Sequence, residues 1–370
     1  MLGLGSNITS ISKTGKTIVK DGLVLRHEYR DGPVQLLSSG AASFVVGNTD
    51  HISCGDNLDV TTNDFSVCAW IKTTAASGTV LAKRSTGAGY ELSLGNGEVS
   101  WYLNDGTGIG DTEDTIAVND GEWHHIAWVF DRDGLAYRYI DGVNSGTNDS
   151  IAARTSSLTN DRNVGIGARL KDTPDNHFDG YVCNLGFWDN RVLTQPQIKS
   201  IMNKNYADLT SSETSDLVSW WNLDETLGDK GIVLDNNGAI GENLLANADF
   251  ANGQDDWSGF GSVYTTLLNG VVTLDGTSGV AQLGQNILTN GSTYEVEFTI
   301  TDHNGDATNS EIIQNNGGSL FAIPGNGVYK IHFTLAYANA SMTFRAKSGS
   351  KFSISNISVK LVNGNHGTLS

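Results

Sequence analysis

Apolar and polar side chains alternate with a period of two over much of this chain, and that alternation predicts strands. In residues 65–72, FSVCAWIK, the odd-numbered positions carry Phe, Val, Ala and Ile and share one face. The same period recurs in residues 90–94, 294–300 and 329–335. The pattern predicts an all-β protein made of β-sandwich domains.

Residues 120–142, DGEWHHIAWVFDRDGLAYRYIDG, read as two strands around a tight turn. The first strand, residues 123–130, is apolar on both faces, which is typical of a strand in the middle of a sandwich. Arg132, Asp133 and Gly134 have hairpin-turn chemistry, because Gly adopts positive φ without strain.

Two local signals break the strand pattern. Thr194 with Gln197 forms a capping box and Pro196 suits a first helical turn, so one short helix should follow. In residues 352–361 the apolar phase slips at Ser355 and Asn356, which predicts a β-bulge or corner there.

The chain is 370 residues long, which favours two domains, and turn-like stretches suggest the boundaries. We expect a short arm over residues 1–20, a first sandwich over 21–230, a linker over 231–242 and a second sandwich over 243–370. The formal net charge of −18 disfavours nucleic acid as a partner.

The three cysteines are too few for a disulfide framework, and Cys68 and Cys183 read as buried thiols. The first residues, MLGLGSNITSISKTGK, do not resemble a secretory signal, and no apolar run is long enough to span a bilayer. We therefore expect synthesis in a cytoplasm and no membrane partner.

The central hairpin also carries a resemblance. DGEWHHIA at residues 120–127, YIDG at 139–142, FSVCAWI at 65–71, VGIG at 164–167 and FDGYVCNL at 178–185 together resemble laminin-G-like, concanavalin-A-like jelly-roll domains. The resemblance covers about residues 20–228. It implies that an opening strand at 22–29 lies beside a closing strand at 217–223.

A second resemblance begins at residue 243. NLLANADF at residues 243–250, Gly253, Trp257 and the closing FSISNISV at 352–359 resemble galactose-binding-like jelly rolls of carbohydrate-binding modules. This resemblance implies a structural calcium ion, for which Asp249 is the candidate ligand. Ser355 stands where that family usually has Asp, a departure that weakens the implied site.

No arrangement for catalysis is evident. The Glu-x-Asp-x-x-Glu strand of laminarinase-type relatives is missing, and so are Gly-x-Ser-x-Gly, Walker and zinc-ligand patterns. His124 and His125 are adjacent in a strand, so they point to opposite faces and cannot chelate one metal ion. We expect a protein that is not an enzyme.

Two loops could bind a cation. Asp131 and Asp133 flank the hairpin turn and could offer oxygen ligands to Ca²⁺. Asp111, Glu113 and Asp114 form another acidic loop. A solvated turn is the alternative interpretation of both, and no cofactor beyond a possible structural calcium is implied.

Carbohydrate binding would need exposed aromatic faces beside polar side chains. The candidates follow strands of the second domain: Trp257 and Tyr264, with Phe260 nearby; Asp302, His303 and Asn304, read as a polar loop; and Tyr337 with Asn339. A packed core position is the alternative for Trp257.

The opening MLGLGS followed by a laminin-G-like domain resembles structural proteins of tailed bacteriophages. We therefore predict a virion protein, either a capsid decoration or a tail or fibre protein, delivered by lysis. Its partners would be capsid or tail proteins of the same virion, possible host cell-surface glycans, and other copies of the chain in a trimer. The alternatives are a carbohydrate-binding accessory of a bacterial extracellular system and a glycan-active enzyme.

Overall fold

The computed structural model describes residues 40–111, 114–224, 232–238, 240–253, 255–260, 265–268, 270–304, 309–314, 319–335 and 341–369. These residues form strands, one short α-helix and two short 3-10 turns, which confirms the predicted all-β class. No helix in these ranges is long and apolar enough to cross a membrane.

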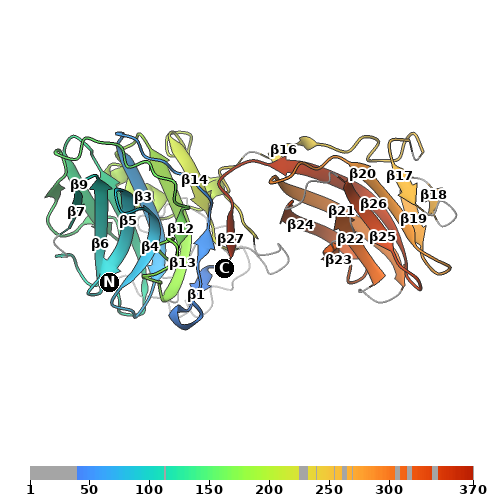
Figure 1. Cartoon of the computed structure of the whole chain (residues 1–370), viewed down its shortest axis with the longest axis horizontal. Coiled ribbons are helices and arrows are strands. Elements are labelled where there is room, and N and C mark those ends of the chain that lie inside the picture. Colours follow the sequence, from blue (N-terminus) through green and yellow to red (C-terminus); the bar gives the residue numbers. More distant parts are fainter. Residues whose placement is uncertain are drawn as a thin grey trace, which may run out of the picture. The chain divides into compact units, whose positions relative to one another are not determined.

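The first sandwich consists of two facing sheets around one core (Figure 1). Sheet A contains β1 (Ala42–Phe44), β13 (Gly180–Asp189), β3 (Phe65–Lys72), β8 (Trp123–Phe130), β9 (Leu135–Ile140) and β10 (Val143–Asn144), with β14 (Leu217–Trp221) on β13 and β11 (Asp149–Ser150) on β9. Sheet B contains β15 (Ile232–Val233), β27 (Gly367–Leu369), β2 (Ile52–Ser53), β12 (Gly165–Ile166), β4 (Gly78–Arg84), β5 (Ala88–Gly95), β6 (Glu98–Asp105) and β7 (Gly108–Gly110).

The predicted hairpin is confirmed at the centre of sheet A. Strand β8 pairs with β3 on one side and with β9 on the other, and Phe130 lies opposite Ala136 beside the turn. Ile126, Trp128 and Phe130 point into the core between the sheets. This strand is therefore covered on both faces, as its two apolar faces predicted.

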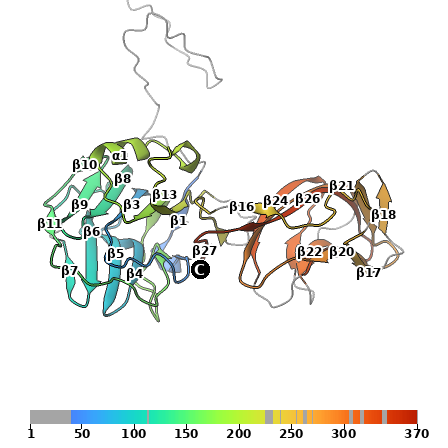
Figure 2. The ribbon, with the colours of Figure 1, turned by 90° about the horizontal axis from the view of Figure 1, so that it is seen from above.

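The outer face of sheet A is covered in part by α1 (Gln195–Ile201), as Figure 2 shows. Ile198 and Ile201 are buried in one apolar cluster with Cys68, Ala127 and Trp188 of the sheet. The predicted capping box is confirmed, because the Thr194 N–H donates to Gln197 Oε1 at 2.9 Å.

All three cysteines are buried thiols. Burial raises the pKa of the Cys68 thiol to about 12. These thiols pack as small apolar groups, as the sequence predicted for two of them.

The second sandwich also has two sheets. One contains β18 (Thr265–Leu268), β19 (Val271–Asp275), β26 (Lys351–Val362), β21 (Thr293–Asn304) and β24 (Gly327–Thr334), with β16 (Ile240–Asn243) on β26. The other contains β17 (Ser258–Phe260), β20 (Ala281–Asn286), β25 (Ser341–Ala346), β22 (Ser310–Gln314) and β23 (Ser319–Ala322).

The predicted bulge in β26 is confirmed. Glu297 of β21 lies opposite Ser358, but Thr299, only two residues on, lies opposite Ser355. Three steps along β26 therefore match two along β21, and Asn356 adopts φ +52° to accommodate the extra residue.

The domain boundaries differ from the expected ones at two places. Strand β15 falls in the expected linker and β27 at the end of the expected second sandwich, yet both belong to sheet B, where β27 pairs with β2 and β15 (Figure 1). The second sandwich is therefore inserted between the edge strand β15 of sheet B and its neighbour β27. The expected arm and the opening strand at 22–29 lie outside the described residues.

Hydrogen bonds from side chains hold the outgoing segment around Asp235 and the returning segment around Asn365 against the first sandwich. Asp235 accepts hydrogen bonds from the backbone N–H groups of Trp220 and Asn365, both at 2.9 Å. The Trp221 indole donates to the Asn365 carbonyl at 3.1 Å. Through Asp235, the outgoing chain thus satisfies backbone N–H groups of the closing strand β14 and of the returning segment.

Candidate functional site

A polar pocket of about 400 Å³ lies at the rim of the first sandwich, at the end of sheet A where β3 begins and β8 ends. We call it the rim pocket. Its lining residues come from four loops: Thr62, Asn63, Asp64, Arg132, Asp133, Ala152, Arg154, Thr155 and Asn190. Hydroxyl, amide, carboxylate and guanidinium groups thus meet in one hollow.

The buried Arg132 side chain ties these loops together. Its guanidinium donates to the carbonyl oxygens of Arg154 at 2.7 Å and Ser156 at 2.8 Å, and its backbone N–H donates to Asp64 Oδ1 at 2.7 Å. Burial lowers the pKa of this guanidinium. Because one side chain satisfies backbone groups of a second loop, the pocket walls are held in place before any ligand binds.

Asp131 and Asp133, the predicted calcium pair, lie side by side in the hairpin turn. A hydrogen bond between their carboxyl groups is the main cause that raises the pKa of Asp131, and burial and the negative charge of Asp64 add to it. In the described ranges no three His, Cys, Asp or Glu side chains are grouped to hold a metal ion. Calcium binding here stays a prediction, and Asp133 contributes to the rim pocket.

The other acidic loop already surrounds a cation. Asp111 and Asp114 form ion pairs of 2.6 and 2.8 Å with Arg138, and Asp149 lies at 3.4 Å from the same guanidinium. Arg138 is fully buried. Its positive charge therefore compensates Asp111 and Asp114, which the sequence analysis considered as metal ligands. Glu113 lies outside the described residues.

The two adjacent histidines point to opposite faces, as predicted. His124 Nδ1 lies 2.9 Å from Asp141 Oδ2, while the buried His125 ring meets Trp70 edge-on, with centroids 5.4 Å apart. Burial lowers the pKa of His125 to about 4. His125 is therefore a neutral packing residue.

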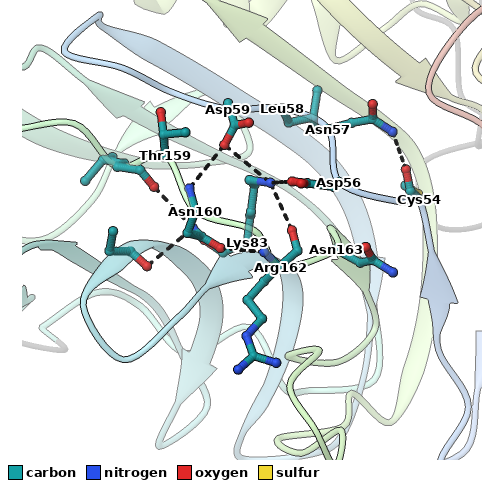
Figure 3. Close-up of polar contacts among 12 residues, drawn as sticks. Cys54, Asp56, Asn57, Leu58, Asp59, Lys83, Thr159, Asn160, Arg162 and Asn163 are labelled. Atoms are coloured by element: carbon teal, nitrogen blue, oxygen red, sulfur yellow. Dashed lines mark hydrogen bonds and ion pairs between the residues drawn. The ribbon is translucent and has the colours of Figure 1, made fainter.

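A buried lysine holds the loops over one end of the first core (Figure 3). Lys83 Nζ forms an ion pair with Asp56, lies 3.3 Å from Asp59 Oδ1 and donates to the Arg162 carbonyl at 2.9 Å. The Lys83 side chain is 0% exposed, whereas those of Asp56 and Asp59 are 51% and 40% exposed. No sequence motif indicates this cluster, because Lys83 lies inside an ordinary strand, β4.

One sugar-binding prediction in the second sandwich is corrected, and so is the loop expected at residues 302–304. Trp257 is only 8% exposed, and its ring centroid lies 5.0 Å from that of Phe250. Its indole N–H donates to the Asn247 carbonyl, so the face of the ring is not open to a sugar. Asp302, His303 and Asn304 do not form a loop, because β21 continues through Asn304. Irregular pairing at Thr301–Asn304 explains why these polar residues read as a loop.

Three other candidates cannot be placed. Tyr264, Tyr337 and Asn339 lie outside the described residues, and so does the side chain of Phe260.

Asp249, the candidate calcium ligand of the second sandwich, lies near Ser355. Asp249 and Ser355 line one pocket of about 410 Å³ beside the bulge of β26. Asp249 Oδ1 accepts the Ala251 N–H at 3.1 Å. One carboxylate and one hydroxyl are a weak ligand set for Ca²⁺, which takes six to eight oxygen ligands.

The comparisons with known proteins concern mainly the first sandwich. Residues 46–199 match the laminin G model of the concanavalin A-like lectin/glucanases superfamily. Neuronal pentraxin-1 of Rattus norvegicus is 29% identical in an alignment of 150 residues that covers 37% of this chain, and the mouse protein matches equally. The matched stretch spans only 33% of those relatives.

Two solved structures are similar to part of the chain. A putative carbohydrate binding protein from Bacteroides ovatus is 17% identical, with 53% of this chain and 55% of that one covered and a TM-score of 0.41. Tailspike protein 2 of an Escherichia coli O157:H7 bacteriophage is 13% identical, with 52% and 28% covered and a TM-score of 0.36. The family match over residues 46–199 agrees with the two-sheet architecture, so the first sandwich has a laminin-G-like, concanavalin A-like jelly-roll fold, which is a lectin-type fold.

Proposed function

We propose that this protein is a non-enzymatic virion protein, a capsid decoration or tail-fibre protein, whose first sandwich binds host surface glycans through the rim pocket. The observation that carries the glycan-binding part is the chemistry of this pocket on a lectin-type fold. Asn63 and Asn190 offer amides, Asp133 a carboxylate and Arg154 a guanidinium, groups that hydrogen-bond sugar hydroxyls.

The state of the pocket carboxylates supports binding without hydrolysis. A glycosidase needs one carboxylic acid and one carboxylate on either side of the scissile bond. Asp64 is already engaged with the Arg132 N–H at 2.7 Å, which leaves Asp133 as the exposed carboxylate of the pocket. Asp131, the hydrogen-bonded neighbour of Asp133, does not line the pocket, and two carboxyl groups in direct contact are closer than the separation of about 5 Å or more that hydrolysis of a glycosidic bond needs.

The virion part rests on the resemblance of the opening residues and domain order to structural proteins of tailed phages. A trimer on a particle would present several pockets at once. Weak contacts to single sugars would then combine into useful avidity, which can exceed single-site affinity by about 10²–10⁴.

A glycan array probed with multivalent protein tests the binding role. We expect binding to a defined glycan group that Asp133→Asn and Asn190→Ala each reduce at least tenfold. Asp208→Asn, an exposed carboxylate in the 3-10 turn Tyr206–Asp208, is the matched control and should bind as wild type. An array without signal above background would overturn glycan binding.

Mass spectrometry of purified phage particles tests the virion role separately. We expect peptides of this chain at a constant ratio to a capsid or tail protein. Particles that lack the chain would overturn that part and favour a bacterial carbohydrate-binding accessory. Hydrolysis of an array sugar that depends on Asp133 would replace the binding role with an enzymatic one.

A further inference from the structure

A row of four side chains crosses sheet A at the end opposite the rim pocket. Strand pairing places Ser43 of β1 opposite Tyr181 of β13, Tyr181 opposite Lys72 of β3, and Lys72 opposite Trp123 of β8. Cross-strand partners point to the same face of a sheet, so the four side chains share the outer face. The row lies about 23 Å from the rim pocket, the length of seven strand residues.

Helix α1 covers the neighbouring row of side chains on sheet A, but it does not cover this row. Cys183, Trp70 and His125 form the neighbouring row, which is buried, and the Trp70 indole donates to the Met202 carbonyl just after α1. In the next row Tyr181 is 45% exposed and Trp123 is half-buried. The other seven tryptophans of the chain are all buried.

The two aromatic rings lean toward each other across Lys72. Their backbones are two strands apart, about 10 Å, yet the ring centroids of Trp123 and Tyr181 are 6.2 Å apart at 51°. The Trp123 indole N–H, the Tyr181 hydroxyl and the Lys72 ammonium have no hydrogen-bond or ion-pair partner within the described part of the chain. Two aromatic faces thus lie beside three hydrogen-bond donors that have no partner among the described residues.

We infer that this row, the aromatic row, is a second saccharide-binding site that takes a pyranose ring carrying a carboxylate. Aromatic faces stack on the apolar face of a sugar ring, and the open donors suit its hydroxyl oxygens. Lys72 is a cation without a counter-ion among the described residues of a chain with net charge −18, so it favours a uronic acid over a neutral sugar.

The row suits a short oligosaccharide better than a protein surface. Four neighbouring strands span about 14 Å, whereas a stable protein interface buries about 800 Å² on each partner. Two rings between a serine and a lysine do not form an apolar patch of that size.

Titration with tetragalacturonic acid and with maltotetraose, a neutral oligosaccharide of the same ring number, tests the inference by calorimetry. We expect the acidic probe to bind more tightly. Trp123→Ala and Tyr181→Ala should each weaken its binding at least tenfold, Trp123→Phe should restore much of it, and Lys72→Met should remove the preference for the acidic probe. Tyr181→Ala is informative even if Trp123→Ala disturbs folding, because Tyr181 is largely exposed.

The rim-pocket variants Asp133→Asn and Asn190→Ala separate the two sites. They should leave tetragalacturonic acid binding unchanged. The inference would be overturned if neither probe bound, if Tyr181→Ala bound as wild type, or if the rim-pocket variants abolished binding. Glycan binding at the rim pocket is measured independently on the array, so either site can fail alone.

Discussion

Replacing Lys83 should cost less stability than replacing its two carboxylate partners. In Lys83→Met, Asp56 and Asp59 lose a counter-ion but are 51% and 40% exposed, so water solvates them. We expect a loss of about 1.5–3 kcal/mol, which is the range for hydrogen bonds to charged groups. In Asp56→Ala/Asp59→Ala the ammonium remains buried with the Arg162 carbonyl as its acceptor, and the loss should reach about 3–5 kcal/mol.

Urea unfolding followed by tryptophan fluorescence measures this difference. Seven of the eight tryptophans lie in the first sandwich and one, Trp257, in the second, so the signal reports mainly the domain that contains Lys83. Lys171→Met, a 45% exposed lysine paired with Asp175, is the control and should change the free energy by less than about 1 kcal/mol. A Lys83→Met variant as unstable as the double alanine variant would refute the asymmetry.

Three further predictions follow from other parts of the structure. The pKa of His125 is about 4 in the folded chain and about 6.5 in the unfolded chain, so the unfolded chain binds the proton first as the pH falls. The free energy of unfolding should therefore fall by about 3 kcal/mol between pH 6.5 and pH 4. In His125→Phe, the midpoint of urea unfolding should depend less on pH over this range. A Cβ on Gly367 would lie 2.3 Å from Ile52 Cγ2, so Gly367→Val should lower the unfolding temperature of the first sandwich in calorimetry. Gly325→Ala, at a position with open space around it, is the control and should not lower it. Equal unfolding temperatures of Gly367→Val and wild type would argue against the pairing of β27 with β2. Ser355→Asp adds a second carboxylate beside Asp249, so calcium should raise the unfolding temperature of this variant more than that of wild type, and identical responses would exclude a calcium site in that pocket.

The sequence predicted the parts of the fold that depend on local pattern. The hairpin at residues 120–142, the capped helix and the bulge at Ser355 each have a signature within about ten residues, and the structure confirms all three. The first sandwich was identified because its motifs occur in order along the chain. Local pattern sufficed wherever neighbours in sequence decide the geometry.

Long-range placement could not be predicted in the same way. The three residues of β27 carry no pattern that distinguishes sheet B from the second sandwich, and their position depends on pairing with Ile52 and Ser53, more than 300 residues earlier. The aromatic row was missed for a related reason. Trp123 reads as core from its strand, and only the limited length of α1 leaves it uncovered.

Residue type alone did not predict which aromatic side chain is exposed. Trp257 has the side chain of a sugar platform but fills the second core, while the rim pocket is built from polar loop residues that have no motif. Exposure decides whether an aromatic residue can bind a ligand, and exposure is a property of the folded chain.

The paired crossings at β15 and β27 have a consequence for how such proteins diversify. The Asp235 N–H and the His366 ring are joined by a hydrogen bond of 3.0 Å, so the segment between them leaves and re-enters at almost the same point. A short turn could replace the whole inserted sandwich without moving the lectin-type scaffold. Related proteins could therefore carry a different inserted domain at this position while they keep the same first sandwich.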